Sequence, residues 1–302
     1  MTTQQATLIG TVSILLWGTL ALMTRWTDAQ IPPFQLLAMT FGLAWLLMQS
    51  RWWLRGESGL RFLHQPLPVW LLGIGGLFGY HLFYFIALAK APAAEAGLIA
   101  YLWPLLIVLL SALLPGERLR SAHILGALLA ASGSALLLIK GEANFSEQHS
   151  IGYLAAGACA LIWSAYSVLS RRHADVPTDT VGWYCAGTAL LGLICHLLFE
   201  QTVWPERPLQ WIGIVGLGLG PVGIAFLTWD IGVKRGNIQL LGTLAYAAPL
   251  ISTLLLILAG EAQASSRLLL ACLLIVGGSM IAGIRLKRML NPASNPIEGE
   301  QH

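Results

Sequence analysis

The phrases AYLWPL at residues 100–105 and AYAAPL at residues 245–250 are two copies of one pattern, Ala-Tyr-x-x-Pro-Leu, set 145 positions apart. Both lie inside long runs that are otherwise almost wholly apolar. In each copy the tyrosine precedes the proline by three residues, so an amphipathic side chain stands about one helical turn before an expected bend. A pattern repeated at this distance indicates that the chain was built by duplication.

The same offset aligns further landmarks. It places Lys90 over Arg235 and Gly97 over Gly242. With one residue of slippage, LLWGTLALMTR (15–25) lies over LIWSAYSVLSR (161–171), and another single gap pairs GERL (116–119) with GEAQ (260–263). We therefore expect two related halves, 1–145 and 146–288, followed by a disordered cytoplasmic tail, 289–302.

The composition places both halves in a lipid bilayer. Of the 302 residues, 56% are hydrophobic and 10% are charged, whereas soluble domains carry about 25% charged residues. A membrane-spanning helix needs about 20 mainly apolar residues. The long continuous runs do not show the alternation of an outer-membrane barrel. Ten helical spans are predicted, near 6–24, 32–50, 68–90, 94–114, 121–140, 151–170, 179–199, 209–233, 237–259 and 267–286.

The basic residues predict the orientation of these spans, because Lys and Arg concentrate in cytoplasmic loops. With the N-terminus inside, twelve of them fall on the cytoplasmic side and five on the opposite side. Both termini are then cytoplasmic. Five spans per half is an odd number, so the second half enters the membrane from the opposite side and the repeats are inverted. Such repeats favour an alternating-access transporter, while a merely structural bundle and a duplicated dual-topology protein stay open as alternatives.

Aromatic side chains at mid-span are the candidate substrate contacts. Trp17 and Trp163 lie at equivalent repeat positions near the middle of their spans, whereas membrane tryptophans usually lie at the interfaces. Packing or lipid contact is the alternative for each of them. The predicted substrate-binding set of nine side chains is Trp17, Tyr80, His81, Tyr84, Tyr101, Trp103, Trp163, Trp229 and Tyr246. Because two positions on a continuous helix differ by about 200°, Tyr101 and Trp103 are not expected to point the same way.

His81 is the histidine deepest in a span, so substrate binding, titration and a packed neutral imidazole are all open interpretations. The prolines Pro104, Pro221 and Pro249 are expected to kink their helices, and Pro104 and Pro249 are also expected to act as hinges.

Glycines at four-residue spacing, Gly75 with Gly79 and Gly216 with Gly220, favour close helix packing. We also expect Gly79 and Gly220 to let helices slide.

Several functions are disfavoured by what the sequence lacks. No phosphate-binding loop of the G-x-x-x-x-G-K-[ST] kind is present, so direct use of ATP is not expected. A membrane enzyme would need clustered His, Asp or Glu, and a channel would need repeated pore charges or a carbonyl filter. We predict no catalytic residue, metal, cofactor, nucleotide or nucleic acid, and expect a small-molecule substrate and the bilayer as the partners. The sequence does not predict an oligomeric state.

The ten-span pattern also resembles a known family. Tryptophans in the first helix of each half, AYLWPLL and AYAAPLI in each fourth helix, and Gly-Glu closing those helices are similar to the EamA-type branch of the drug/metabolite transporter superfamily. The resemblance covers nearly the whole chain. It implies an all-α fold of two inverted five-helix repeats. It also implies efflux of aromatic amino acids across the bacterial inner membrane, through a central cavity between the halves.

Overall fold

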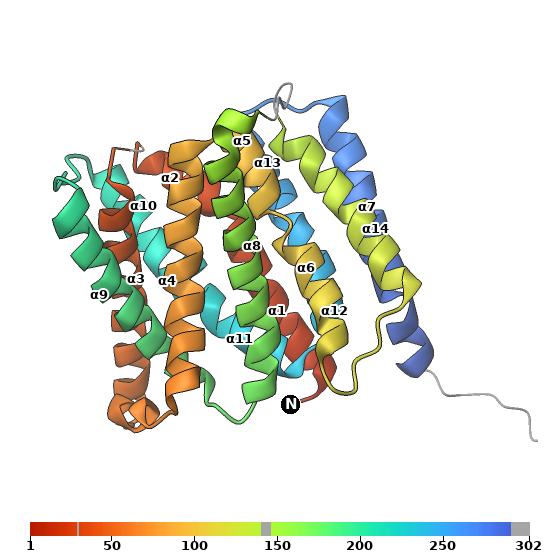
Figure 1. Ribbon diagram of the computed structural model, residues 1–302, viewed down its shortest axis with the longest axis horizontal. Coiled ribbons are helices and arrows are strands. Elements are labelled where there is room, and N and C mark those ends of the chain that lie inside the picture. Colours follow the sequence, from red (N-terminus) through yellow and green to blue (C-terminus); the bar gives the residue numbers. More distant parts are fainter. Residues whose placement is uncertain (29, 140–145, 291–302) are drawn as a thin grey trace, which may run out of the picture.

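The computed structural model describes residues 1–28, 30–139 and 146–290, with side chains described through residue 282. These residues form helices joined by short loops, and no strand occurs among them (Figure 1). The predicted all-helical fold is therefore confirmed. The first half contains α1 (Thr3–Gly18), α2 (Leu20–Trp26), α3 (Pro33–Leu54), α4 (Leu67–Lys90), α5 (Ala93–Ala100), α6 (Trp103–Leu110) and α7 (Ser121–Leu138).

The second half repeats this order. Its helices are α8 (Ser150–Ser170), α9 (Val181–Phe199), α10 (Pro208–Leu217), the π-helical segment Gly218–Ile224, α11 (Ala225–Arg235), α12 (Ile238–Leu244), α13 (Ala248–Leu258) and α14 (Ser266–Leu290). Short 3-10 turns cover Gly59–Leu63, Ser111–Leu113, Glu147–His149, Arg171–His173, Thr178–Thr180 and Ala245–Ala247.

Eight described segments are long and apolar enough to cross a membrane, the first being Thr3–Trp26 and the last Ile238–Leu258. The two remaining spans are α3, whose glutamines and tryptophans lower its hydropathy, and α14, whose apolar part is the shorter segment Ser266–Ala282. All ten spans agree with the predicted positions to within a few residues. The helix α14 runs to Leu290, past the predicted start of the tail at residue 289, and residues 291–302 lie outside the described part.

Several spans are interrupted within their length. The first is broken at Thr19, the fourth at residues 101–102, the eighth by the π-helical segment and the ninth by the turn Ala245–Ala247. In the fourth and ninth spans a proline follows the break at the second helical position, Pro104 and Pro249. Proline is tolerated there because its missing N–H would have no helical partner. The helix is therefore interrupted just before each of these prolines, while their role as hinges stays a prediction.

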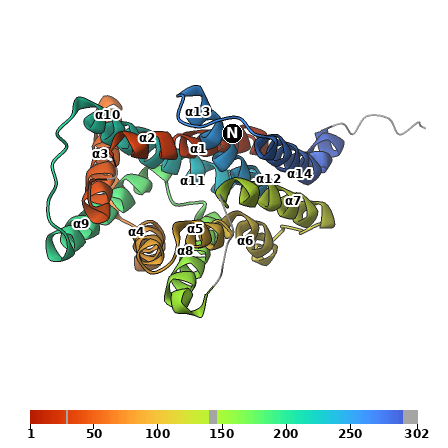
Figure 2. The same cartoon turned by 90° about the horizontal axis from the view of Figure 1, so that it is seen from above.

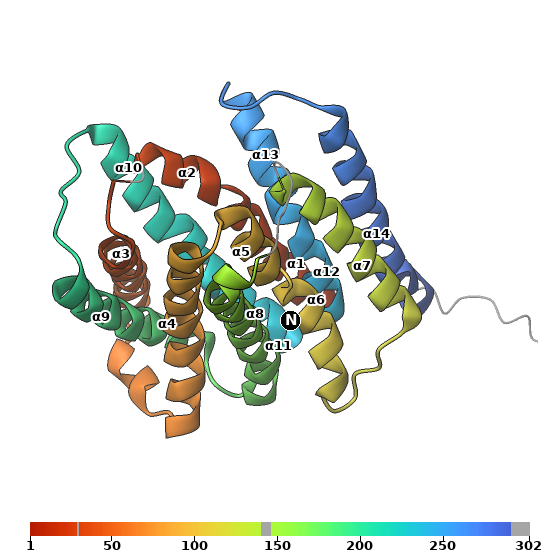
Figure 3. The same cartoon turned by 45° about the horizontal axis from the view of Figure 1, so that its top comes forward.

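The halves of the broken spans pack differently on the two faces of the bundle. We call the face at which α1 begins the N-terminal face, and the other the opposite face. At the N-terminal face α6 packs against α12. At the opposite face α5 packs on α8 while α13 packs on α1, and among the described residues no comparable packing joins α5 to α13 (Figures 2 and 3).

Two glycines at equivalent repeat positions show the same difference in helix packing between the two faces. A Cβ atom built on Gly242 in α12 would lie 3.0 Å from a methyl of Val108 and 3.1 Å from the carbonyl oxygen of Pro104. A Cβ built on Gly97 in α5, the repeat equivalent of Gly242, would meet no atom within 4 Å. In the described part of the chain, the bundle is therefore closed by the contact of α6 with α12 at the N-terminal face, and the equivalent contact of α13 with α5 is not formed at the opposite face.

Candidate functional site

Four tryptophans from four different helices form one cluster at the centre of the bundle. Each half contributes two of them, Trp17 and Trp103 from the first and Trp163 and Trp229 from the second. All six pairs of rings are in contact, with centroid separations from 5.0 to 6.3 Å. Most of these pairs adopt the edge-on or tilted arrangements that the aromatic quadrupole favours. The cluster ties the two halves together at mid-membrane.

Hydrogen bonds orient the rings. The indole N–H of Trp17 donates to the carbonyl oxygen of Pro221 at 3.0 Å. This carbonyl lies in the π-helical segment, where the N–H of Ala225 reaches back to Gly220 instead of Pro221. The indole N–H of Trp229 donates to Ser167 Oγ at 3.0 Å. The π-helical segment is thus the local distortion that gives the Trp17 indole its partner.

The two tyrosines of the duplicated phrase cross between the halves. Tyr101 donates its hydroxyl hydrogen to the carbonyl oxygen of Ala245 at 3.0 Å. Tyr246 accepts the backbone N–H of Leu105 at 3.1 Å. Their ring centroids lie 5.9 Å apart. Each hydroxyl therefore bonds to a backbone group at the break in the other half.

One expectation about this region is wrong. Tyr101 and Trp103 do contact each other, with ring centroids 5.9 Å apart. The prediction that they could not point the same way assumed a continuous helix, whereas α5 ends at Ala100 and α6 begins at Trp103. The helix is interrupted at Tyr101 and Leu102, and this interruption lets the rings of Tyr101 and Trp103 contact each other.

The remaining predicted residues extend the cluster along α4. The ring of Tyr80 lies 5.7 Å from that of Trp163 and 6.0 Å from that of Tyr84. His81 Nδ1 lies 2.7 Å from the carbonyl oxygen of Leu77. Because a carbonyl only accepts, Nδ1 carries the hydrogen, and a neutral imidazole then presents Nε2 as an acceptor. The nine predicted residues thus form one connected set, while their roles in binding stay a prediction.

Sequence reasoning missed two phenylalanines that complete this set. Phe41 is fully buried, and its ring centroid lies 5.1 Å from that of His81 and 5.6 Å from that of Phe226. Phe226 in turn lies 5.6 Å from Trp163. A signal existed for Phe226, since it precedes Trp229 by three residues and so shares a helix face with it. Phe41 carried no such signal.

The glycine prediction is partly wrong. Gly75 meets no atom within 4 Å, and the close approaches on α4 occur instead at Gly73, against Tyr184, and at Gly76, against Tyr166. In α10, Gly216 lies near Met23 as expected, with an added Cβ 3.1 Å from its sulfur.

A Cβ atom built on Gly79 would lie 3.6 Å from Ile162, and one built on Gly220 would lie 3.6 Å from Leu16, which are ordinary van der Waals separations. The hinge role of both glycines stays a prediction.

Charged groups near the site are already paired. Asp230 and Lys234 form a buried ion pair with 3.0 Å between the carboxylate oxygen and Nζ. Thr178 donates to the same carboxylate at 2.7 Å, and Lys234 donates to the carbonyl oxygen of Val176 at 2.9 Å. Among the described residues no group of three His, Cys, Asp or Glu side chains could hold a metal ion. The centre of the bundle is therefore aromatic and close to neutral.

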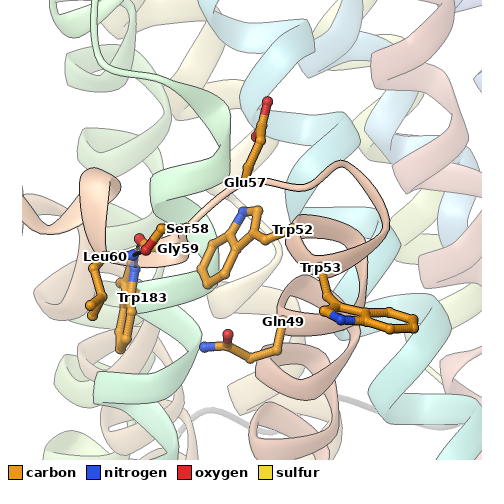
Figure 4. A pocket seen from close by; sticks show the side chains of 8 residues that line it. All are labelled: Gln49, Trp52, Trp53, Glu57, Ser58, Gly59, Leu60 and Trp183. Atoms are coloured by element: carbon orange, nitrogen blue, oxygen red, sulfur yellow. Dashed lines mark hydrogen bonds between the residues drawn. The ribbon is translucent and has the colours of Figure 1, made fainter.

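A separate cavity of about 290 Å³ lies near the N-terminal face, between the end of α3 and the start of α9 (Figure 4). Its aromatic walls include Trp52 and Trp183, whose rings stack with centroids 5.8 Å apart. Trp53, at its rim, is largely exposed. These side chains are distinct from the four-tryptophan cluster, so the molecule offers two aromatic sites at different depths.

A duplicated helical bundle whose halves share one central aromatic cluster defines a polytopic membrane transport protein. Comparison with known families gives the particular class: the EamA-like transporter family model matches residues 5–139 and 150–284. The chain belongs to this family.

Named relatives agree with that assignment. The aromatic amino acid exporter YddG of Ancylobacter novellus is 57% identical, over 95% of this chain and all of that protein. The protein of the same name from Escherichia coli is 25% identical, over 95% of this chain and all of that protein. The pseudopaline exporter CntI of Pseudomonas aeruginosa is 28% identical over 68% of this chain and 71% of that one. A solved crystal structure with 55% identity superposes with a TM-score of 0.91, covering 96% of this chain and all of that one.

Proposed function

We propose that this chain is a secondary transporter that exports small amphipathic metabolites, above all aromatic amino acids, across the bacterial inner membrane by alternating access. Both termini then lie in the cytoplasm, and the N-terminal face is the cytoplasmic face. The halves 1–145 and 146–288 are the two inverted units. In this account the chain acts as a carrier and catalyses no chemical reaction.

The observation that carries the proposal is the four-tryptophan cluster, to which each half contributes two rings. A site shared between the halves changes its access when the halves rock, which is the behaviour of inverted-repeat carriers. Trp17 in this cluster is half-buried, and so are the neighbouring side chains of Tyr80, His81 and Tyr101. Their faces suit a flat apolar body, and the free Nε2 of His81 suits a small polar head group.

The scarcity of unpaired charged groups at the site is consistent with export, because a weakly bound substrate can be released. Stacking on an aromatic face contributes about 0.5–1.5 kcal/mol per pair beyond the burial of area. Several such contacts can hold a zwitterion that carries no net charge, and they still allow its release. A strong ion pair would slow release, and the buried Asp230 and Lys234 already satisfy each other.

Counterflow in proteoliposomes tests the proposal. Vesicles preloaded with unlabelled phenylalanine should accumulate labelled phenylalanine and tryptophan transiently, because a carrier exchanges bound solute. A panel including aliphatic amino acids, run with and without a pH gradient, defines the substrate class and any coupling to protons. Rapid equilibration without overshoot would indicate a channel. The absence of any uptake of the panel would contradict the proposed substrate.

The relatives name one further possibility. Since the Pseudomonas aeruginosa relative is named for pseudopaline, the panel should include larger amino-acid derivatives. Transient accumulation of those compounds, with none of phenylalanine, would show that the chain is a carrier of the larger derivatives and not of aromatic amino acids.

A further inference from the structure

Two ion pairs in this chain are copies of each other. Arg171 and Glu117 lie 2.6 Å apart, and Arg25 and Glu261 lie 2.8 Å apart. The repeat alignment places Arg25 over Arg171 and Glu117 over Glu261. Each pair joins the end of the first span of one half to the segment that follows the fourth span of the other half. The first pair is at the N-terminal face and the second is at the opposite face.

The pair at the N-terminal face is embedded in a larger network. Besides Glu117, Arg171 donates to the carbonyl oxygens of Val233 at 3.0 Å and Gly236 at 2.7 Å. Gln239 donates to the second carboxylate oxygen of Glu117 at 3.1 Å. The side chains of Arg171 and Glu117 are 23% and 21% exposed. At the N-terminal face this network joins the end of α8 to the end of α11, to the start of α12 and to the loop that follows α6.

The ion pair at the opposite face is more exposed and has fewer hydrogen-bond partners. The side chains of Arg25 and Glu261 are 60% and 41% exposed. Within the described residues, each side chain makes only the contact with the other. An exposed pair of this kind contributes little to stability. The more buried ion pair, Arg171 with Glu117, therefore lies at the face where α6 packs on α12. The more exposed pair, Arg25 with Glu261, lies at the face where the described residues of α5 and α13 are not packed on each other.

The end of α4 carries backbone carbonyl groups that are equivalent to the hydrogen-bond acceptors of Arg171. At the end of α11, the N–H of Gly236 bonds to the carbonyl of Gly232, and at the end of α4 the N–H of Ala91 bonds to the carbonyl of Ala87. These positions differ by the repeat offset of 145, so the two helices end in the same way. The carbonyl groups equivalent to those of Val233 and Gly236 are those of Leu88 and Ala91.

The carbonyl of Leu88 is also without its helical partner. That partner would be the N–H of residue 92, and Pro92 has none. An orphan carbonyl at a helix C-terminus is a favourable acceptor for a guanidinium group. At the position equivalent to Gln239 the chain has Ala94, which offers no amide to the carboxylate.

We propose that the two ion pairs are alternating latches. The network of Arg171 and Glu117 holds the state seen here, and the pair of Arg25 and Glu261 becomes the closed latch of the reverse state. In that state Arg25 bonds the carbonyls of Leu88 and Ala91. The latch at the opposite face lacks the amide contact of Gln239, so the state closed at the N-terminal face is the favoured one. This inference rests on the alternating access of the proposed function.

Distance measurements between spin labels test the latches without any substrate. Lys90 and Leu258 are exposed at the opposite face. Their repeat equivalents, Arg235 and Leu113, are exposed at the closed N-terminal face. Labels at positions 90 and 258 should therefore stay outside the interface when the opposite face closes. The labels replace Lys90 and Leu258 with cysteine in a full-length chain whose four native cysteines are alanine, in lipid nanodiscs. Closure of the opposite face should appear as a shorter label distance.

The variants act in opposite directions. Glu117→Gln should raise the population with the short distance about tenfold, as expected from loss of one partly buried, charge-assisted hydrogen bond. Adding Glu261→Gln to that variant should remove most of the gain, because it weakens the other latch. Arg25→Gln should act as Glu261→Gln does. Glu57→Gln is the control, since Glu57 pairs with Arg61 within one segment, and it should leave the distances unchanged.

Two results overturn the proposal. If Glu117→Gln yields no short distance, the first pair does not hold the closed face. If adding Glu261→Gln or Arg25→Gln leaves the short population intact, the second pair is an ordinary surface contact. Counterflow is judged separately, so opposite shifts without solute exchange would reject the proposed substrate and keep the latches.

Discussion

The matched glycines Gly97 and Gly242 give a prediction in which the two halves serve as each other's control. Both lie at the fifth position of a short helix, α5 and α12, and each is replaced by alanine in turn. In the structure a Cβ on Gly242 would press on the backbone oxygen of Pro104 and on Val108. The same atom on Gly97 would enter open space.

The magnitude follows from two terms. Alanine is favoured over glycine inside a helix by about 1 kcal/mol, and this gain is common to both variants. The contacts at 3.0 and 3.1 Å are tighter than ordinary van der Waals separation, and one partner is backbone that cannot rotate away. Overpacking of this kind costs about 1–3 kcal/mol. Gly97→Ala should therefore be more stable than Gly242→Ala by about 1–3 kcal/mol.

Thermal unfolding of the two purified variants in the same detergent measures this difference, with the unchanged chain as the reference. Gly97→Ala should match or exceed the reference, and Gly242→Ala should melt a few degrees below Gly97→Ala. Equal melting temperatures, or the reverse order, would refute the assignment of a closed N-terminal face and an open opposite face.

Three further changes probe the centre and its supports. Trp163→Ala should lower the apparent affinity for tryptophan in counterflow about two- to tenfold, the value of one aromatic contact. Tyr246→Phe should destabilise the fold by about 1–3 kcal/mol in thermal unfolding, because the N–H of Leu105 loses its buried acceptor. Asp230→Ala should cost about 3–5 kcal/mol by leaving Lys234 buried without its partner, and adding Lys234→Met should recover much of that loss.

Each of these changes has its own check. Trp211→Ala, at an exposed position outside the cluster, should leave counterflow unchanged, and an equal loss there would mean that the Trp163 effect is not local. A Tyr246→Phe protein as stable as the reference would show that water replaces the hydroxyl. If Lys234→Met does not rescue Asp230→Ala, the carboxylate matters through Thr178 and not through the ion pair.

The duplication made most of the fold predictable. Spans of apolar residues mark helices because lipid leaves the backbone no other partner, and the landmarks of one half located those of the other. The breaks were predictable where a proline accompanies them, as at Pro104, Pro221 and Pro249. The interruption at Thr19 and the π-helical geometry around Pro221 depend on tertiary contacts, among them the indole of Trp17.

The candidate site was predictable as a set of residues and less so as a geometry. Tyr101 and Trp103 were expected on different faces because the helix was taken as continuous. Packing glycines were placed at Gly75 on spacing alone, which cannot say which face of α4 meets a neighbour. The network of Arg171 was missed because two of its partners are backbone carbonyls, which have no signature in sequence.

We propose that substrate binds at the four-tryptophan cluster, halfway through the membrane. Photo-crosslinking with a diazirine derivative of phenylalanine, followed by peptide mapping, tests it most directly. We expect labelling of Trp17, Trp163, Tyr80 or Tyr101, and we expect unlabelled phenylalanine to protect these residues from labelling. Protectable labelling confined to the cavity at Trp52 and Trp183 would contradict it.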